Sequence, residues 1–309
     1  MIYTVTLNPA LDKSAEIPGF RRGQVNRITA IHTDPGGKGI NVSKVLAVLG
    51  HQSIACGLIA GHTGENILRA LEQDGIICDF DRIPGETRTN LKIYDPEDRS
   101  TTDVNEPGPA VLPEALDALR DRICAKLSAG DVLVLSGSLP SSASKDTYAR
   151  WIRSAKARGA AVLADAEGEV LRQCADAAPT FLKPNADELS GLFGKQLSTE
   201  EDLIAAAKDL IASGVEKLII SRGAEGAIFV NKKEILIASS LPVTLRCTVG
   251  AGDSMVAAFA SGLERGLSTE ETFSLAMAVS AASVEMPGST PPPLARVEEL
   301  RSQVVLRRL

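Results

Sequence analysis

Thr248-Val249-Gly250-Ala251-Gly252-Asp253-Ser254 leads into a stretch typical of a helix and rich in small residues, namely Ala257, Ala258, Ala260, Ser261 and Gly262. Two glycines around one alanine let backbone N–H groups turn toward a ligand, and the start of a helix adds partial positive charge. The stretch therefore predicts an anion hole built by Gly250, Ala251 and Gly252. Asp253 follows at the helix start, either as a simple capping residue or as a base beside a phosphoryl group.

The segments around this stretch indicate an α/β fold. Apolar runs alternate with amphipathic stretches, which is the pattern of parallel strands joined by crossover helices. Several runs are continuous in Val, Ile and Leu, which suits a mostly parallel sheet covered on both faces. We expect strands at 131–136, 160–165, 180–183, 217–221 and 227–231, and helices near 142–158, 199–213 and 252–265. We expect one domain over residues 1–309.

Two early segments break this rhythm. Residues 26–33 and 88–105 have the alternation of half-buried strands, with no helix between neighbours. The second segment predicts a hairpin, with strands at 89–94 and 100–104 around the turn Asp95-Pro96-Glu97-Asp98. We expect a small antiparallel sheet, inserted at about 12–34 and 87–107, that serves as a lid and shields a reaction from water.

Bulk composition excludes several functions. The 309 residues are 44% hydrophobic and carry a net charge of -6 without a basic cluster, so neither nucleic acid nor an anionic membrane is an expected partner. The N-terminus lacks the pattern of a signal peptide, and no stretch is apolar enough to span a bilayer. The five cysteines are widely spaced, with no Cys-x-x-Cys pair. We expect reduced thiols and a cytoplasmic protein.

Three further clusters suit ligand binding. PGGKGIN at 35–41 precedes an amphipathic helix but is not a Walker A loop, and no Gly-x-Gly-x-x-Gly follows the first strand, which weighs against a nicotinamide dinucleotide. KPNADE at 183–188 offers oxygens that suit Mg²⁺, although an ordinary helix start has the same composition. SRGAEG at 221–226 allows a nucleotide to lie against backbone, or simply forms a hairpin.

Taken in order, these clusters resemble the ribokinase-like (PfkB) carbohydrate kinases, and the likeness runs over nearly the whole chain. TLNPALD at 6–12, SGSLP at 136–140 and NEPGP at 105–109 are similar to the branch of bacterial phosphofructokinases and tagatose-6-phosphate kinases, with the 1-phosphofructokinases nearest. The resemblance implies a doubly wound sheet flanked by helices, a β lid over the sugar, ATP with Mg²⁺, and a homodimer built through the lids.

The resemblance also implies roles for individual residues. Asp253 would be the catalytic base, with Gly250, Ala251 and Gly252 as the anion hole. The residues that would hold the sugar phosphate are Asp12, Arg27, Gly36, Gly37, Lys38, Asn41, Arg88, Asn90 and Ser138. Those that would hold the nucleotide are Lys183, Asn185, Ser221, Gly223, Gly226, Thr248, Gly250 and Gly252. Asn185 and Glu188 would bind the metal ion.

Arg88 resembles the arginine that binds the substrate phosphate in this family, and a guanidinium suits that role because it can make two parallel charge-assisted hydrogen bonds to a phosphate. Arg27, from the other lid segment, would assist. Asp165, at the end of a predicted strand, either helps to hold metal or water or is an ordinary strand-terminal aspartate.

The expected reaction is phosphorylation of fructose 1-phosphate at O6 to give fructose 1,6-bisphosphate. The alternative is phosphorylation of tagatose 6-phosphate at O1 to give tagatose 1,6-bisphosphate. A more distant alternative is a non-catalytic sensor of sugar phosphates or nucleotides, against which the intact Gly-Ala-Gly-Asp segment argues.

Overall fold

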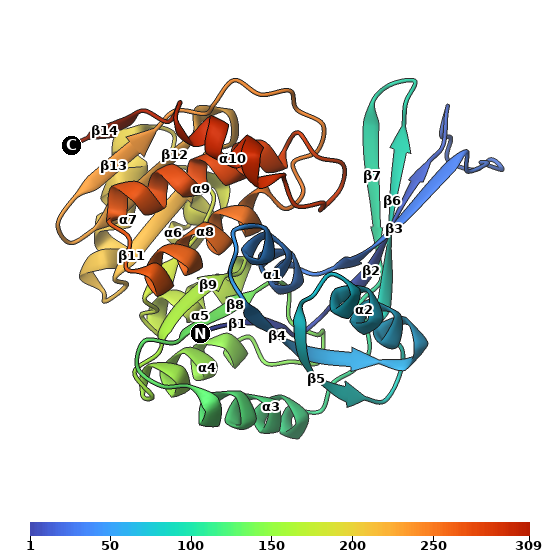
Figure 1. Ribbon diagram of the computed structural model, residues 1–309, viewed down its shortest axis with the longest axis horizontal. Coiled ribbons are helices and arrows are strands. Elements are labelled where there is room, and N and C mark those ends of the chain that lie inside the picture. Colours follow the sequence, from blue (N-terminus) through green and yellow to red (C-terminus); the bar gives the residue numbers. More distant parts are fainter.

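A computed structural model describes residues 1–309, and its largest element is a ten-stranded sheet in the order β14-β13-β12-β11-β10-β9-β8-β1-β4-β5 (Figure 1). All neighbours from β11 to β5 pair in parallel, whereas β12, β13 and β14 pair antiparallel at one edge. The bounds are β1 (Ile2–Thr6), β4 (Ser53–Ala60), β5 (Ile77–Ile83), β8 (Val132–Ser136), β9 (Ala161–Asp165), β10 (Phe181–Leu182), β11 (Lys217–Ser221), β12 (Ala227–Asn231), β13 (Ile235–Ala238) and β14 (Leu306–Arg308). The mostly parallel sheet confirms the α/β expectation.

Helices cover both faces of this sheet, because its central strands are apolar on both sides. One face carries α3 (Pro113–Lys126), α4 (Thr147–Lys156), α5 (Gly168–Asp176), α6 (Ala186–Phe193) and α7 (Glu200–Ala212), whose apolar residues form one large buried cluster. The other face carries α1 (Lys38–Val48), α2 (Gly61–Gln73), α8 (Ala251–Arg265), α9 (Thr269–Ser283) and α10 (Leu294–Arg301). No helix of the protein combines the length and apolarity that crossing a bilayer requires.

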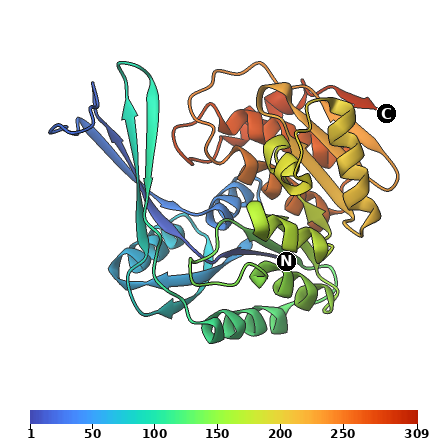
Figure 2. The ribbon, with the colours of Figure 1, turned by 180° about the vertical axis from the view of Figure 1, so that it is seen from behind.

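A second sheet of four strands forms the lid, in the order β3-β2-β6-β7. Its strands are β2 (Ala10–Glu16), β3 (Ala30–Gly36), β6 (Arg88–Asp95) and β7 (Ser100–Asn105). The lid stands beside the helical body and projects past it, as the two opposite views show (Figures 1 and 2). Its two halves come from separate parts of the chain, residues 10–36 and residues 88–105.

The expectation of an antiparallel lid was wrong for its central pair. The two hairpins, β2 with β3 and β6 with β7, are antiparallel, but β2 and β6 pair in parallel, with Asp12 opposite Asn90. The intervening chain forms α1, β4, α2 and β5 before β6 begins. This long crossover returns the chain to the same end of the lid, which is the connection that a parallel pair needs.

The boundaries follow local hydrogen bonds. β11 and β12 have the predicted bounds, but the 142–158 helix begins only at Thr147, because the residues before it form turns such as Ala143 N–H to Pro140 C=O at 2.9 Å. The predicted strand at 180–183 shortens to β10. β3 begins at Ala30 rather than at residue 26, since the Asn26 side chain bonds the backbone N–H and C=O of Arg21 and closes a loop there.

Candidate active site

A cavity of about 890 Å³ lies between the lid and the carboxyl ends of the parallel strands. The ends of β1, β8, β9 and β11 all reach it, through Thr6, Gly137, Asp165 and Ser221. Ligands of open α/β sheets bind in this position, because strand ends and helix starts meet there with unpaired polar groups. One end of the cavity is lined by lid residues and the other by residues 240–249 and by α9.

The first turn of α8 forms the floor between these two ends. Gly250 is its N-cap, with φ 83, a left-handed conformation that favours glycine. The N–H groups of Gly252 and Asp253 donate to no backbone carbonyl, whereas that of Ala251 makes a 3.3 Å bond to the Thr248 carbonyl. These free amides at a helix N-terminus face the cavity that Gly252 and Asp253 line, so they suit an anion.

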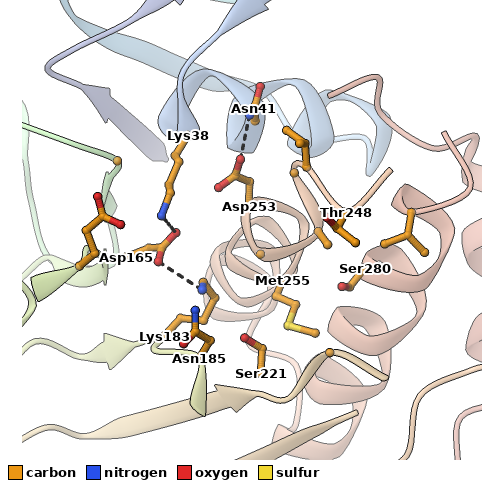
Figure 3. A pocket seen from close by; sticks show the side chains of 18 of the residues that line it. Lys38, Asn41, Asp165, Lys183, Asn185, Ser221, Thr248, Asp253, Met255 and Ser280 are labelled. Atoms are coloured by element: carbon orange, nitrogen blue, oxygen red, sulfur yellow. Dashed lines mark hydrogen bonds and ion pairs between the residues drawn. The ribbon is translucent and has the colours of Figure 1, made fainter. Parts of the chain in front are cut away.

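Asp253 is the buried carboxylate of this turn, with 5% of the residue exposed. Asn41, one turn into α1, donates a 2.8 Å hydrogen bond from Nδ2 to its Oδ2 (Figure 3). Burial and the negative charge of Asp165 raise the pKa of Asp253 to about 6, against the opposing effects of Asn41, Lys38 and Lys183. Asp253 is therefore mostly ionised at neutral pH. Its raised pKa also makes it a better proton acceptor than an ordinary aspartate.

Asp165, at the end of β9, holds two lysines in the floor of the cavity (Figure 3). Its Oδ2 lies 3.4 Å from Lys38 Nζ and its Oδ1 lies 3.2 Å from Lys183 Nζ, while Ser136 donates to Oδ2 at 3.3 Å. Burial disfavours its charge, but Lys183 and Lys38 outweigh this and hold its pKa below the usual range. The arrangement brings one ammonium from the start of α1 and one from the end of β10 to a single carboxylate.

The ammonium of Lys183 also lies against the anion-binding turn. A Cβ added to Gly252 would lie 3.2 Å from Lys183 Nζ, so glycine leaves space for the lysine here. The positive charge and the free amides of α8 therefore adjoin the same part of the cavity. This is the electrostatic environment in which a transferred phosphoryl group is stabilised.

Asn185 and Glu188 form a capping box at the start of α6. Asn185 Oδ1 accepts from the Glu188 N–H at 2.7 Å, and Glu188 Oε2 accepts from the Asn185 N–H at 2.8 Å. Both residues line the cavity, and Glu188 keeps Oε1 free of these bonds. No cluster of three or more His, Cys, Asp or Glu side chains is arranged to hold a metal ion. The Glu188 oxygen left outside the capping box suits a Mg²⁺ whose other ligands are water and phosphate oxygens.

The end of the cavity farthest from the lid is apolar. Ser221, Gly223 and Gly226 line it beside the β11–β12 connection, and the remaining wall comes from Leu241, Val243, Leu245, Met277 and Val284. Gly226 has φ 91, and a Cβ there would lie 2.0 Å from the Ala238 carbonyl oxygen, so only glycine fits. Arg222 turns away from the cavity to Glu200, 3.3 Å distant. An apolar slot beside backbone suits a flat heterocycle.

The lid end of the cavity is polar. Asn90 donates a 2.9 Å bond from Nδ2 to Asp12 Oδ1, across the parallel β2–β6 pair. Arg88 bonds only neutral oxygens, namely the carbonyls of Glu106 and Asn8 at 3.1 Å and Ser138 Oγ at 3.5 Å. Its Nε is buried without a partner, and burial lowers its pKa despite the nearby carboxylates. A half-buried guanidinium with no ion pair is ready to bind an anion.

The structure brings nearly all the predicted site residues to this one cavity. Arg27 and Gly36 are the exceptions: Arg27 is exposed in the loop before β3, and Gly36 packs against the Asp12 carboxylate without lining the cavity. The apolar wall at 241–245 was not identified from the sequence, although Leu241, Val243 and Leu245 follow the alternation of a strand. Lys92 was also missed, although strand alternation with Arg88 and Asn90 would have indicated it.

Comparison with known proteins agrees with this geometry. Residues 5–295 match the model of the pfkB family carbohydrate kinases. The chain belongs to that family. A pfkB-family match over this length accounts for both the main sheet and the lid, so the protein is a sugar kinase, a phosphotransferase that uses ATP.

Relatives of the pfkB-family chain include phosphofructokinases. A 1-phosphofructokinase of Rhodobacter capsulatus is 38% identical over 309 residues, covering 100% of this chain and 98% of the relative. One of Xanthomonas campestris pv. campestris is 40% identical over 266 residues, covering 84% and 83%. The structure of phosphofructokinase-2 from Escherichia coli in complex with fructose-6-phosphate superposes with a TM-score of 0.91 at 28% identity, over 98% of both chains. A tetrameric inhibited form of that enzyme superposes equally well, with a TM-score of 0.91.

Proposed function

We propose that the protein transfers the γ-phosphoryl group of ATP to the C6 hydroxyl of fructose 1-phosphate, giving fructose 1,6-bisphosphate and ADP. The observation that carries this proposal is the position of Asp253 and the free amides of α8 between a polar, lid-covered end and an apolar end of one cavity. A sugar phosphate suits the first end and an adenine nucleotide the second. The similarity to 1-phosphofructokinases from two bacteria supports the choice of sugar.

The transfer is a direct in-line displacement. Asp253 accepts the proton of the C6 hydroxyl while the C6 oxygen of the sugar bonds to the γ-phosphorus. The bond between the γ-phosphorus and the β–γ bridging oxygen breaks, and ADP leaves. Asn41 orients the carboxylate through its 2.8 Å bond. The amides of α8 and the ammonium of Lys183 neutralise charge on the transferred group. Closure of the lid excludes water, which would otherwise compete as acceptor.

The metal ion required is Mg²⁺, carried on the phosphates of ATP. Glu188, through its free Oε1, and Asn185 are the residues that would hold it, directly or through water. When bound, it supplies positive charge to the phosphates of the nucleotide. Ser221, Gly223, Gly226 and Thr248 would bind the nucleotide along the remaining wall.

The sugar is oriented by the lid and by the start of α1. Asp12, Asn90 and Asn41 present oxygens and amides suited to hydroxyl groups, with the backbone of Gly37 close by. Arg88 would bind the 1-phosphate, because its guanidinium has an unpaired Nε and no carboxylate within ion-pair distance. Ser138 shares this contact, and Arg27 remains a prediction for the same group.

A substrate panel tests the proposal. Purified protein with ATP and Mg²⁺ is assayed for ADP release on fructose 1-phosphate, tagatose 6-phosphate and fructose 6-phosphate. We expect the highest kcat/KM on fructose 1-phosphate, since a site built for one arrangement of hydroxyl groups rejects analogues that leave buried polar groups unpaired. A higher kcat/KM on tagatose 6-phosphate would identify that compound as the substrate in place of fructose 1-phosphate. The absence of ADP release on all three sugars would favour a non-catalytic sensor.

We also propose that two copies pair through their lids, in the cytoplasm. The lid and its loops expose apolar side chains, with Val25 86%, Ile31 58% and Val104 53% exposed, which a second copy would cover. All five cysteines are free thiols, in agreement with a reducing compartment. Sedimentation equilibrium of the wild type and of Ile31→Lys tests the pairing: a dimer that the substitution dissociates is expected, and a wild-type monomer contradicts it.

A further inference from the structure

The inner face of β6 presents a row of three polar side chains to the cavity. Arg88, Asn90 and Lys92 all line it, whereas Leu91 and Ile93 turn to the outer face and pack in the small apolar cluster of the lid. This alternation follows from the period of two along a strand. Lys92 is therefore a residue of the substrate cavity, one step along the lid from Asn90.

The charge of Lys92 is only loosely engaged. Its side chain is 17% exposed, yet its one ion pair is a 3.5 Å contact with Asp103, whose side chain is 50% exposed. Asp103 lies directly opposite Lys92 on β7 and does not line the cavity. Because the contact is long and the partner is half-exposed, this ion pair holds the ammonium only weakly, and the ammonium is free to turn toward an anion in the cavity.

The cationic side chains other than Lys92 do not balance the negative charge that a sugar phosphate would bring into the cavity. Lys38 and Lys183 both pair with Asp165 in the floor of the cavity. Arg88 and Lys92 are the remaining cationic residues that line the cavity. A sugar phosphate is close to a dianion at neutral pH, and Asp12 adds a negative charge on the same face of the lid, so Arg88 alone cannot balance it.

We propose that Lys92 is a second cationic binding residue for the phosphate of the sugar, and that it makes the enzyme selective for phosphorylated over unphosphorylated sugars. The inference rests on the proposed function, and it extends that function by assigning Lys92 to the binding of the sugar phosphate. Arg88 and Lys92 lie four residues apart on one strand, about 13 Å between Cα atoms. Their long side chains reach inward from either side of Asn90, so they can approach one phosphate from two directions.

Lys92→Met tests the proposal, because it keeps the length of the side chain and removes the charge. The matched control is Lys13→Met, on the outer face of the adjacent strand β2 and outside the cavity lining. The kcat/KM of each variant is measured on fructose 1-phosphate and on fructose, with the KM for ATP and the melting temperature alongside. Lys92→Arg is the conservative variant.

We expect Lys92→Met to lose about ten- to a hundredfold in kcat/KM on fructose 1-phosphate, as charge-assisted hydrogen bonds typically require. Its kcat/KM on fructose, its KM for ATP and its melting temperature should match those of Lys13→Met, and Lys92→Arg should recover most of the loss. An equal loss on fructose and fructose 1-phosphate, or wild-type kinetics on both, would overturn the assignment.

Failure of the proposed function is visible separately, in the wild type. If wild-type protein prefers another sugar phosphate, the same comparison is made with that compound and its unphosphorylated sugar. If no sugar releases ADP, the rise in melting temperature on adding fructose 1-phosphate decides the role of Lys92. A rise that Lys92→Met abolishes and Lys13→Met retains supports it, and a rise that both retain, or none in the wild type, refutes it.

Discussion

Replacing Asp253 by asparagine tests both the chemistry of the site and its cost to the fold. The substitution keeps the shape of the side chain, and the Asn41 Nδ2 group retains an oxygen to bond. It removes the base, so kcat should fall by orders of magnitude while the KM for each substrate changes little. It also removes a buried charge that the folded state holds at a free-energy cost.

That cost follows from the pKa of Asp253. The carboxyl titrates near 3.8 in the unfolded chain and at about 6 in the folded protein. Between these pH values the native state binds the extra proton, so stability declines as pH rises through this window and the full cost is present above about pH 6. The difference corresponds to about 3 kcal/mol. The neutral variant avoids it.

We therefore expect Asp253→Asn to be inactive and yet more stable than the wild type at pH 8, by up to about 3 kcal/mol. Differential scanning calorimetry at pH 8 and at pH 4.5 measures this. The melting temperature of the variant should exceed that of the wild type at pH 8, and the gap should narrow markedly at pH 4.5. A variant that melts below the wild type at pH 8, or a gap independent of pH, would refute the account of a strained, charged base.

Three further outcomes are expected. The kcat/KM of the wild type on its sugar should fall on the acid side with an apparent pKa near 6, because protonated Asp253 cannot accept the hydroxyl proton; a limb near pH 4 in the pH–rate profile would contradict this. Lys38→Met should reduce kcat by about a hundredfold or more, with a smaller change in the KM for sugar phosphate, since Lys38 pairs with Asp165 in the floor of the cavity. Steady-state kinetics that show an effect on KM alone would instead assign Lys38 to binding of the sugar phosphate. Gly226→Ala should raise the KM for ATP and lower the melting temperature, because its Cβ would lie 2.0 Å from the Ala238 carbonyl oxygen; unchanged thermal melting would show that this turn adjusts freely.

The sequence predicted the parts of the fold that local pattern determines. The continuous apolar runs of β11 and β12 have the predicted bounds, because burial on both faces requires Val, Ile and Leu there. It could not predict that β2 pairs in parallel with β6, since alternation specifies which residues share a face and not which strand lies beside them. The direction of that pair depends on a crossover through α1, β4, α2 and β5.

The candidate site was predictable where a motif and a strand end coincide. Lys183 and Ser221 converge because each ends or directly follows a strand of the parallel sheet, whereas Asp253 was found from its motif, since a loop separates it from β13. Arg27 was selected from the family resemblance and its position in a predicted lid segment, and it lies on a loop outside the cavity of its own chain. The apolar wall around Val243 was missed because Leu241, Val243 and Leu245 alternate as in a strand, yet they belong to a loop whose position in the fold that alternation does not specify.

The parallel pairing of β2 and β6 also bears on how the molecule folds. Asp12 and Asn90, which meet across this pair, are separated by 78 positions in the chain. Closing so long a loop costs entropy before the contact repays it, so the pair is expected to assemble only after the intervening β4 and β5 have joined the main sheet. The lid, and with it the sugar end of the cavity, would then be completed only after this part of the main sheet has formed.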